Sequence, residues 1–283
     1  MVFGAFDLRK KVLRVTFRVT KLRAIGDIPH HLIKYGYMKR LWWLLLIIPL
    51  LLTLGFVIWA LTGPGAMPEA EAALTSDSLV DVDTNRWLVF HPASGDPSTG
   101  LIFYPGARVD PVAYAPLAQA IAAEGYLVVI TPMPLNLAFL APSRALDVME
   151  AYPEISSWAV GGHSLGGAMA ANFAANHPEE VAGLALWAAY PGQSDDLSNL
   201  DLIVTSIYGT NDGLASLGEI RASESLLPLD TSWVAIQGGN HGQFGWYGSQ
   251  SGDNPAGVSR EDQQAQIVQA TLEMLSALSG RGR

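Results

Sequence analysis

The stretch Ala159-Val-Gly-Gly-His-Ser-Leu-Gly-Gly-Ala168 decides the fold of this chain. The apolar residues before it predict a short buried strand, and the small residues after it, up to Ala175, predict a helix that packs closely on a sheet. Its centre has the pattern Gly-x-Ser-x-Gly, which is typical of a sharp strand-to-helix turn that exposes a serine hydroxyl. Gly162 and Gly166 suit this turn because a side chain at either position would collide with the neighbouring strand or helix.

Ser164 is the predicted nucleophile at this turn. The N–H of Leu165 falls in the first turn of the helix, where backbone donors are unpaired and the helix dipole is positive, so it can stabilise an oxyanion. Both features suit attack on a carbonyl group. The alternative is a glycine-rich helix N-terminus that binds an anion or no ligand at all.

Strands and helices alternate on both sides of this turn, which predicts an α/β fold with a mostly parallel sheet and helices on both faces. The predicted strands of the parallel part lie at 101–104, 126–130, 157–160, 181–189, 201–208 and 231–237, and a helix over 260–278 closes the domain. Two earlier strands, at 78–83 and 86–90, predict a hairpin at the sheet edge. Asp110 precedes Pro111, which favours a helix N-cap over a catalytic role.

An uncharged apolar run, LWWLLLIIPLLLTLGFVIWAL, occupies Leu41 to Leu61. As a helix with a rise of about 1.5 Å per residue it spans roughly 30 Å, the thickness of the hydrocarbon core of a bilayer. It predicts a transmembrane helix over residues 41–62 that acts as an uncleaved signal anchor. A cleaved signal peptide is the main alternative, disfavoured by the long basic leader and the length of the run. A buried core helix fits less well because it would rarely lack a polar face.

Charge is distributed unevenly along the chain. Ten of its 17 Lys and Arg residues precede Leu41, together with only two of its 26 Asp and Glu residues, and no lysine follows Lys39. The cytoplasmic flanks of membrane helices carry the excess of Lys and Arg, which predicts a cytoplasmic N-terminus and an extracytoplasmic domain at the cell membrane. The acidic character of the remaining residues argues against nucleic acid as a partner.

These features predict four segments. Residues 1–40 form a basic cytoplasmic segment, 41–62 the anchor, 63–73 a short stalk rich in Pro, Gly, Ala and Glu, and 74–283 the catalytic domain. The chain contains no cysteine, so it has neither disulfides nor a thiol nucleophile, and no metal or cofactor site is predicted. The sequence does not specify an oligomeric state.

A serine nucleophile needs a histidine base and a carboxylate that orients this base. His241 follows the last predicted strand, in Gly-Gly-Asn-His-Gly, at the edge of the sheet from which it can reach Ser164. Asp212, in Tyr-Gly-Thr-Asn-Asp-Gly, holds the same kind of position after the preceding strand. Asp201 and Asp230 precede strands and therefore belong to the opposite edge. A turn-forming role is the alternative for Asp212.

The order Ser164, Asp212, His241 and the motifs GGHSLGG, YGTNDG and GGNHGQFG resemble those of serine hydrolases with the α/β-hydrolase fold. The resemblance covers Leu79 to Leu278 and points to the small single-domain group similar to dienelactone hydrolase. It implies a second oxyanion donor, the N–H of Ala107. Two departures matter: dienelactone hydrolases use a cysteine nucleophile, so their substrate is not implied here, and the short interval between Ser164 and Asp212 leaves no room for a large cap domain.

The resemblance implies hydrolysis of a small-molecule carboxylic ester through an acyl-enzyme, as in carboxylesterases. Phe244, Trp246 and Tyr247 follow the base and are candidates for the substrate pocket, with packing against the closing helix as the equal alternative. Thioesterase, amidase or perhydrolase chemistry on the same scaffold is a second hypothesis. A non-catalytic binding domain displayed at the membrane is a third, disfavoured because such a domain would tolerate loss of the three residues.

Overall fold

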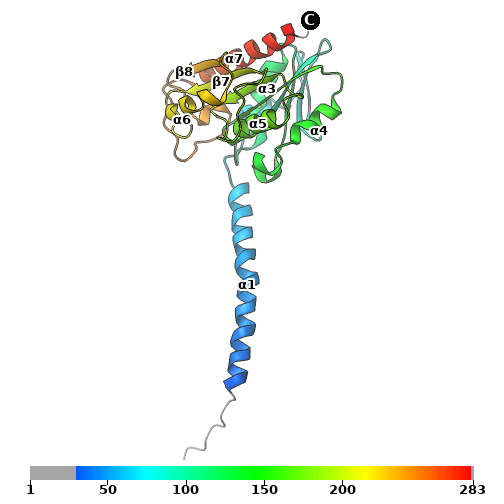
Figure 1. Ribbon diagram of the computed structural model, residues 1–283. Helices are drawn as coiled ribbons and strands as arrows, with labels where there is room; N and C mark the ends of the chain where they lie inside the picture. Colours follow the sequence, from blue (N-terminus) through cyan, green and yellow to red (C-terminus); the bar gives the residue numbers. More distant parts are fainter. Residues whose placement is uncertain (1–29, 282–283) are drawn as a thin grey trace, which may run out of the picture. The chain divides into compact units, whose positions relative to one another are not determined.

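The computed structural model describes residues 30–281, and within them the strands form one eight-stranded sheet with the order β1-β2-β4-β3-β5-β6-β7-β8 (Figure 1). β3 to β8 are parallel, while β1 and β2 form an antiparallel hairpin at one edge. The strands are β1 (Val80–Asp83), β2 (Leu88–Pro92), β3 (Thr99–Tyr104), β4 (Leu127–Ile130), β5 (Ser157–His163), β6 (Gly183–Trp187), β7 (Ile203–Gly209) and β8 (Ser232–Ile236). The predicted α/β-hydrolase fold, with its edge hairpin, is confirmed.

Helices cover both faces of the sheet, which explains why its central strands are apolar on both sides. Leu101 and Phe103 of β3 pack with α3 and α7 on one face, whereas Ile102 and Tyr104 pack with α4 and α5 on the other. The helices of the domain are α2 (Pro68–Ala72), α3 (Ala115–Ala122), α4 (Arg144–Ala151), α5 (Leu165–Asn176), α6 (Leu217–Ala222) and α7 (Arg260–Arg281). Short 3₁₀ turns occur at η1 (Pro111–Tyr114), η2 (Pro134–Asn136), η3 (Ala138–Leu140), η4 (Glu224–Leu226) and η5 (Gly242–Phe244).

The helix expected after Asp110 begins as the 3₁₀ turn η1 and continues as α3. The Asp110 side chain accepts a hydrogen bond from the N–H of Val112 at 2.9 Å, and Pro111 occupies the first position of the turn. Asp110 therefore caps this turn, as its sequence context predicts.

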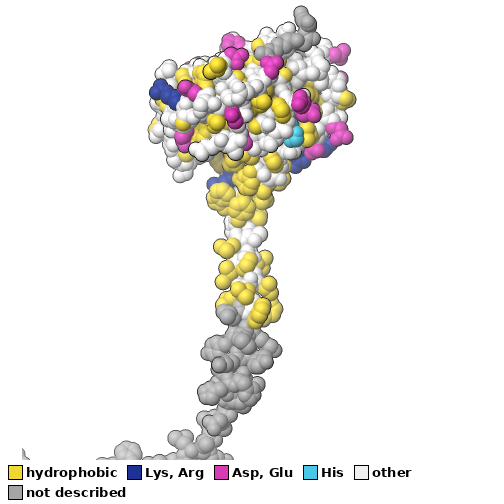
Figure 2. Space-filling model, viewed as in Figure 1, with side chains coloured by type: hydrophobic (Ala, Val, Ile, Leu, Met, Phe, Trp, Pro, Cys, Tyr) yellow, Lys and Arg dark blue, Asp and Glu magenta, His cyan; other side chains and the backbone are white. Residues whose placement is uncertain are grey.

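The chain divides into two compact units, residues 1–53 and 54–283. α1 (His30–Leu61) crosses this boundary, and its portion Trp42–Leu61 is long and apolar enough to cross a membrane. The large hydrophobic side chains of this portion are exposed, and Figure 2 shows them along the helix. The predicted basic segment 1–40 lies mostly outside the described residues.

Residues 63–73, expected to be a stalk, lie against the domain within the second unit. The N–H of Met67 donates to the carbonyl of Trp246 at 2.9 Å, and Ala70 and Ala73 are buried. Alanine-rich composition does not distinguish a solvated stalk from a short helix that covers the domain, so the packed structure of α2 was not predictable from it. The packed part of the chain thus begins before Leu74.

Candidate active site

Ser164 stands at a strained turn between β5 and α5. Its backbone angles are φ 54° and ψ −123°, a conformation that an L-residue adopts only at a cost and that is commonly found at functional sites. The N–H of Ser164 donates to the carbonyl of Trp187, and the carbonyl of Ser164 accepts from the N–H of Ala168. These two bonds fix the turn between β6 and the first turn of α5.

The glycines around Ser164 are required by close backbone approach. A Cβ atom at Gly166 would lie 2.1 Å from the carbonyl oxygen of Tyr104, and one at Gly162 would lie 2.5 Å from the carbonyl carbon of Gly166. Both distances are far below van der Waals contact. The loop that follows β3 can therefore lie against the serine turn only because these positions lack side chains.

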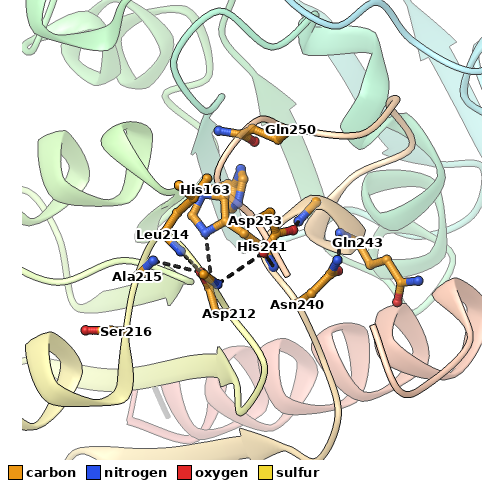
Figure 3. Close-up of polar contacts among 12 residues, drawn as sticks. His163, Asp212, Leu214, Ala215, Ser216, Asn240, His241, Gln243, Gln250 and Asp253 are labelled. Atoms are coloured by element: carbon orange, nitrogen blue, oxygen red, sulfur yellow. Dashed lines mark hydrogen bonds and ion pairs between the residues drawn. The ribbon is translucent and has the colours of Figure 1, made fainter. Parts of the chain in front are cut away.

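Asp212 and His241 lie within hydrogen-bond distance of each other behind this turn. Oδ2 of Asp212 accepts from Nδ1 of His241 at 2.8 Å, while Oδ1 accepts from the N–H groups of Leu214 and Ala215, each at 2.7 Å (Figure 3). Both side chains are almost fully buried. Because the carboxylate is held on both oxygens, it fixes the orientation of the imidazole and the tautomer with the proton on Nδ1.

Ser164 and His241 line the same cavity of about 250 Å³. Nε2 of His241 is buried and has no hydrogen-bond partner among residues 30–281, so it is free to accept a proton. No Asp, Glu, Lys or Arg of the described part of the chain lines this cavity. Its lining consists of Ser164, Leu165, Ala168, Ala188, Ala189, Tyr190, Leu214, Ala215 and His241.

Two backbone N–H groups are available as oxyanion donors. Within residues 30–281 neither Leu165 nor Ala107 donates its N–H to a protein acceptor. Leu165 begins α5, so its donor also benefits from the positive end of the helix dipole. Ala107 belongs to the loop after β3, which packs against the serine turn at Gly162 and Gly166. The predicted oxyanion role of both groups remains a prediction.

The family model described as the alpha/beta hydrolase family matches residues 100–265, more than half of the chain. The chain belongs to the α/β-hydrolase family. No curated protein matches it in sequence.

Solved structures of other hydrolases share the fold at low sequence identity. A predicted CIB-like hydrolase from Thermoplasma acidophilum has a TM-score of 0.53 and 14% identity over 70% of this chain and 99% of its own. The esterase domain of a Rhodothermus marinus protein has a TM-score of 0.50 and 14% identity, covering 66% of this chain and 91% of its own. A structure reported with LipS and LipT, two metagenome-derived lipolytic enzymes, also has a TM-score of 0.50 and 14% identity, covering 64% of this chain and 94% of its own.

Asp253 is a carboxylate beside His241 that sequence analysis missed. Its Oδ1 accepts from the N–H groups of Gly213, His241 and Asn254 at 3.2, 3.2 and 2.9 Å, and its Oδ2 accepts from the N–H of Gly242 at 2.7 Å (Figure 3). Gly213 directly follows Asp212. Asp253 therefore holds together the loop that carries Asp212 and the loop that carries His241. No sequence pattern reveals it, because it lies in an irregular loop and its partners are backbone groups of distant segments.

His163, the residue before Ser164, does not line the cavity and is fully buried. The hydroxyl of Tyr114 lies 2.8 Å from Nδ1 of His163 and accepts from the N–H of Gly106 at 3.0 Å. Because that hydroxyl has one proton, it donates the proton to Nδ1, which must be unprotonated. Burial lowers the pKa of His163 well below its ordinary value and raises that of the Tyr114 hydroxyl, so both groups stay neutral. Tyr114 thereby connects the serine turn to the residue before Ala107.

Phe244, Trp246 and Tyr247 do not line the cavity that holds Ser164. Phe244 and Tyr247 are fully buried in the core between the sheet and α7, and Trp246 packs against that core. This placement corrects their candidacy as pocket residues and matches the alternative of packing under the closing helix. The actual lining comes from residues 188–190 after β6 and from Leu214 and Ala215, small or apolar positions that carry no motif.

Residues 30–281 contain no group of three His, Asp or Glu side chains suited to hold a metal ion.

Proposed function

We propose that this chain is a membrane-anchored serine hydrolase that cleaves carboxylic esters through an acyl-enzyme. The observation that carries the proposal is the buried Asp212–His241 pair beside a cavity that Ser164 also lines. The strained conformation of Ser164 supports the same assignment, since it matches the turn that exposes a nucleophilic serine in this family.

In the proposed mechanism Nε2 of His241 removes the proton from Oγ of Ser164 as this oxygen attacks the ester carbonyl carbon. Asp212 stabilises the imidazolium that forms. The N–H groups of Leu165 and Ala107 stabilise the tetrahedral oxyanion until the alcohol leaves with the proton from His241. Water, activated by the same histidine, then attacks the acyl-enzyme and releases the carboxylic acid.

The cavity favours an uncharged acyl group. Its lining is dominated by alanine and leucine side chains, and within the described residues no charged side chain meets it. An ester with an apolar acyl chain of modest length suits its volume of about 250 Å³. The names of the structural neighbours, an esterase domain and lipolytic enzymes, favour esters over the thioester and amide alternatives.

The proposed location follows from the N-terminal region. The basic residues before Leu41 favour a cytoplasmic N-terminus, α1 is apolar enough to serve as a single anchor, and the acidic domain then lies outside the cell membrane.

Substitution of the three residues tests the mechanism. Ser164→Ala should abolish both hydrolysis of p-nitrophenyl esters and labelling by a fluorophosphonate probe, and His241→Ala and Asp212→Asn should each lower kcat by ~10⁴-fold or more. Asp110→Asn is the matched control, because asparagine caps a helical turn as well as aspartate does. Labelling that persists in Ser164→Ala would refute the serine mechanism. Near-full activity in Asp212→Asn would refute only the assignment of the acid.

A further inference from the structure

The loops that carry the candidate site are also the loops that meet the end of α1. Within the unit 54–283, Nε of Arg108 donates to the carbonyl of Trp59 at 2.7 Å, and the N–H of Met67 donates to the carbonyl of Trp246 at 2.9 Å. Arg108 lies in the loop after β3, and Trp246 lies in the loop after β8. Both loops are at the carboxyl edge of the parallel strands, the edge that holds Ser164. The apolar helix therefore joins the domain at its active-site edge.

Arg108 holds the end of α1 directly against the domain, at what we call the junction. Its guanidinium lies 4.4 Å from the centre of the Trp59 ring and also donates to the carbonyl of Thr62 at 3.3 Å. Trp59 belongs to the apolar portion of α1 itself, so no free spacer separates the helix from the domain. Tryptophan and arginine are the residues that favour the boundary between lipid and water. Arg108 directly follows Ala107, so the loop after β3, which carries the proposed oxyanion donor, lies next to that boundary.

A pair of exposed apolar side chains lies at the same edge. Phe139 and Leu140 form part of η3, between β4 and α4, and each is more than two-fifths exposed. The preceding turn is bonded to the junction, since the N–H of Arg108 donates to the carbonyl of Asn136 at 2.8 Å. Single exposed apolar residues are ordinary, but an adjacent aromatic and aliphatic pair in a segment bonded to Arg108, which also binds the end of α1, indicates a contact surface.

We propose that this active-site edge docks on the surface of the bilayer that α1 crosses, and that the substrate is an uncharged acyl ester held in that surface. The inference rests on the proposed hydrolase function and on the anchor. Docking brings the mouth of the cavity to the lipid surface. The acyl group of an ester held in the membrane can then enter the cavity and reach Ser164, while the alcohol portion of the ester stays in the lipid. The acidic exterior of the domain does not oppose this contact at neutral lipids, because the docking groups are Phe139, Leu140 and the anchor.

Site-specific fluorescence tests the docking directly, since the chain has no cysteine and one introduced cysteine labels one site. The full chain is reconstituted in phosphatidylcholine vesicles as Leu140→Cys or Leu229→Cys, each labelled with an environment-sensitive dye. Leu229 is an exposed leucine that precedes β8, at the opposite edge, and is the matched control. We expect lipids brominated in the acyl chain to quench the dye at 140 at least twofold and to leave the dye at 229 unchanged. Equal quenching at both sites, or none at 140, would overturn the proposal.

A pair of substrates tests the substrate class. p-Nitrophenyl butyrate reports hydrolysis in water, and the butyrate ester of a long-chain alcohol dissolved in the vesicles reports hydrolysis at the surface. Phe139→Asp/Leu140→Asp should lower surface hydrolysis at least fivefold and keep hydrolysis in water within twofold, whereas Leu229→Asp should change neither. An unchanged surface rate, or an equal loss on both esters, would refute docking and leave the esterase function intact. If the wild type hydrolyses neither ester in a Ser164-dependent way, the proposed function itself fails.

Discussion

At the scale of single residues, one carboxylate outside the proposed triad has an unusually demanding set of contacts. Asp253 accepts hydrogen bonds from four backbone N–H groups, two of which belong to His241 and Gly242 and a third to Gly213. Hydrogen bonds to a charged acceptor are each worth about 1.5–3 kcal/mol. The position of His241 relative to Asp212 therefore depends on a side chain whose hydrogen bonds all go to backbone N–H groups.

Asp253→Ala should lower kcat for p-nitrophenyl butyrate by about 10- to 100-fold with little change in KM, because misplacing a catalytic group by about 1 Å can cost this much. Asp253→Asn keeps one acceptor oxygen and should recover part of the loss. Asp196→Ala, which removes an exposed carboxylate bonded to the N–H of Ser198, is the control. An Ala variant that unfolds at lower temperature yet keeps its kcat when folded would assign Asp253 a purely structural role.

Tyr114 is the second residue whose effect on the site is indirect. Tyr114→Phe removes the acceptor for the Gly106 N–H and the donor to His163. The loop after β3, which contains Ala107, then loses a hydrogen bond that holds it in place. We expect kcat to fall about tenfold, less than the ~100-fold or more for complete loss of an oxyanion donor. Tyr104→Phe is a matched control, because that hydroxyl also donates one bond and accepts one, to Pro142 and from Ala145. Equal kcat values for the two variants, at comparable loss of stability, would contradict the positioning role.

Sequence reasoning located the residues whose position follows from strand ends. Ser164 directly follows β5, and Asp212 and His241 lie in the loops that follow β7 and β8. The carboxyl ends of parallel strands share one edge, so the proximity of these three residues is predictable. Asp253 and Tyr114 act through backbone groups of other loops, which no local pattern encodes. Phe244 and Tyr247 were misplaced because sequence distance from the base says nothing of which way an aromatic ring points.

At the scale of elements, the strands of the sheet and the helices that follow Asp110, Ser164 and Ser259 followed from alternation and apolar runs. The short helix α6 and the segment before the domain did not. Residues 63–73 resemble a linker in composition, yet the carbonyl of Trp246 holds Met67 and the core buries Ala70 and Ala73. The short helix α2 buries Ala70 and is followed by the buried Ala73, and these are too few apolar residues to show a period. Its position therefore depends on tertiary contacts rather than on its own sequence.

Removal of residues 1–73 should accordingly leave a less stable domain than removal of residues 1–61. The shorter protein loses the hydrogen bond from Met67 to Trp246, worth about 1 kcal/mol, and the burial of two alanine side chains, worth about 0.8 kcal/mol each. The longer bonds that the carbonyls of Pro64 and Thr62 accept from Asp110 and Arg108 are lost as well and add little. For a domain of this size the total of about 2–3 kcal/mol corresponds to a Tm lower by about 5–10 °C. Differential scanning calorimetry of both proteins measures the difference. Identical Tm values would show that α2 is only loosely attached in solution.

At the scale of the whole molecule, charge and hydropathy divide the chain more sharply than any motif. The domain surface in Figure 2 carries many Asp and Glu side chains and few Lys and Arg side chains. Seventeen basic residues are present, and the concentration of ten of them before Leu41 leaves the domain with a net negative charge. This charge bias could be found from the sequence, because the predicted membrane topology depends only on the number of Lys and Arg residues on each side of the apolar helix. The edge at which the helix meets the domain depends on the contacts of Arg108, which the sequence does not reveal.

The reactivity of single introduced cysteines in intact cells tests the proposed topology. Because the chain has no cysteine of its own, only the introduced residue can be labelled. Gln193 is exposed on the domain, so Gln193→Cys should react with a membrane-impermeant maleimide in intact cells. Thr20→Cys, in the basic segment, should react only after permeabilisation, because the excess of Lys and Arg retains this segment in the cytoplasm. The two variants are controls for each other, since both share the same anchor and expression. Labelling of Thr20→Cys in intact cells, with Gln193→Cys protected, would reverse the orientation and place ester hydrolysis in the cytoplasm.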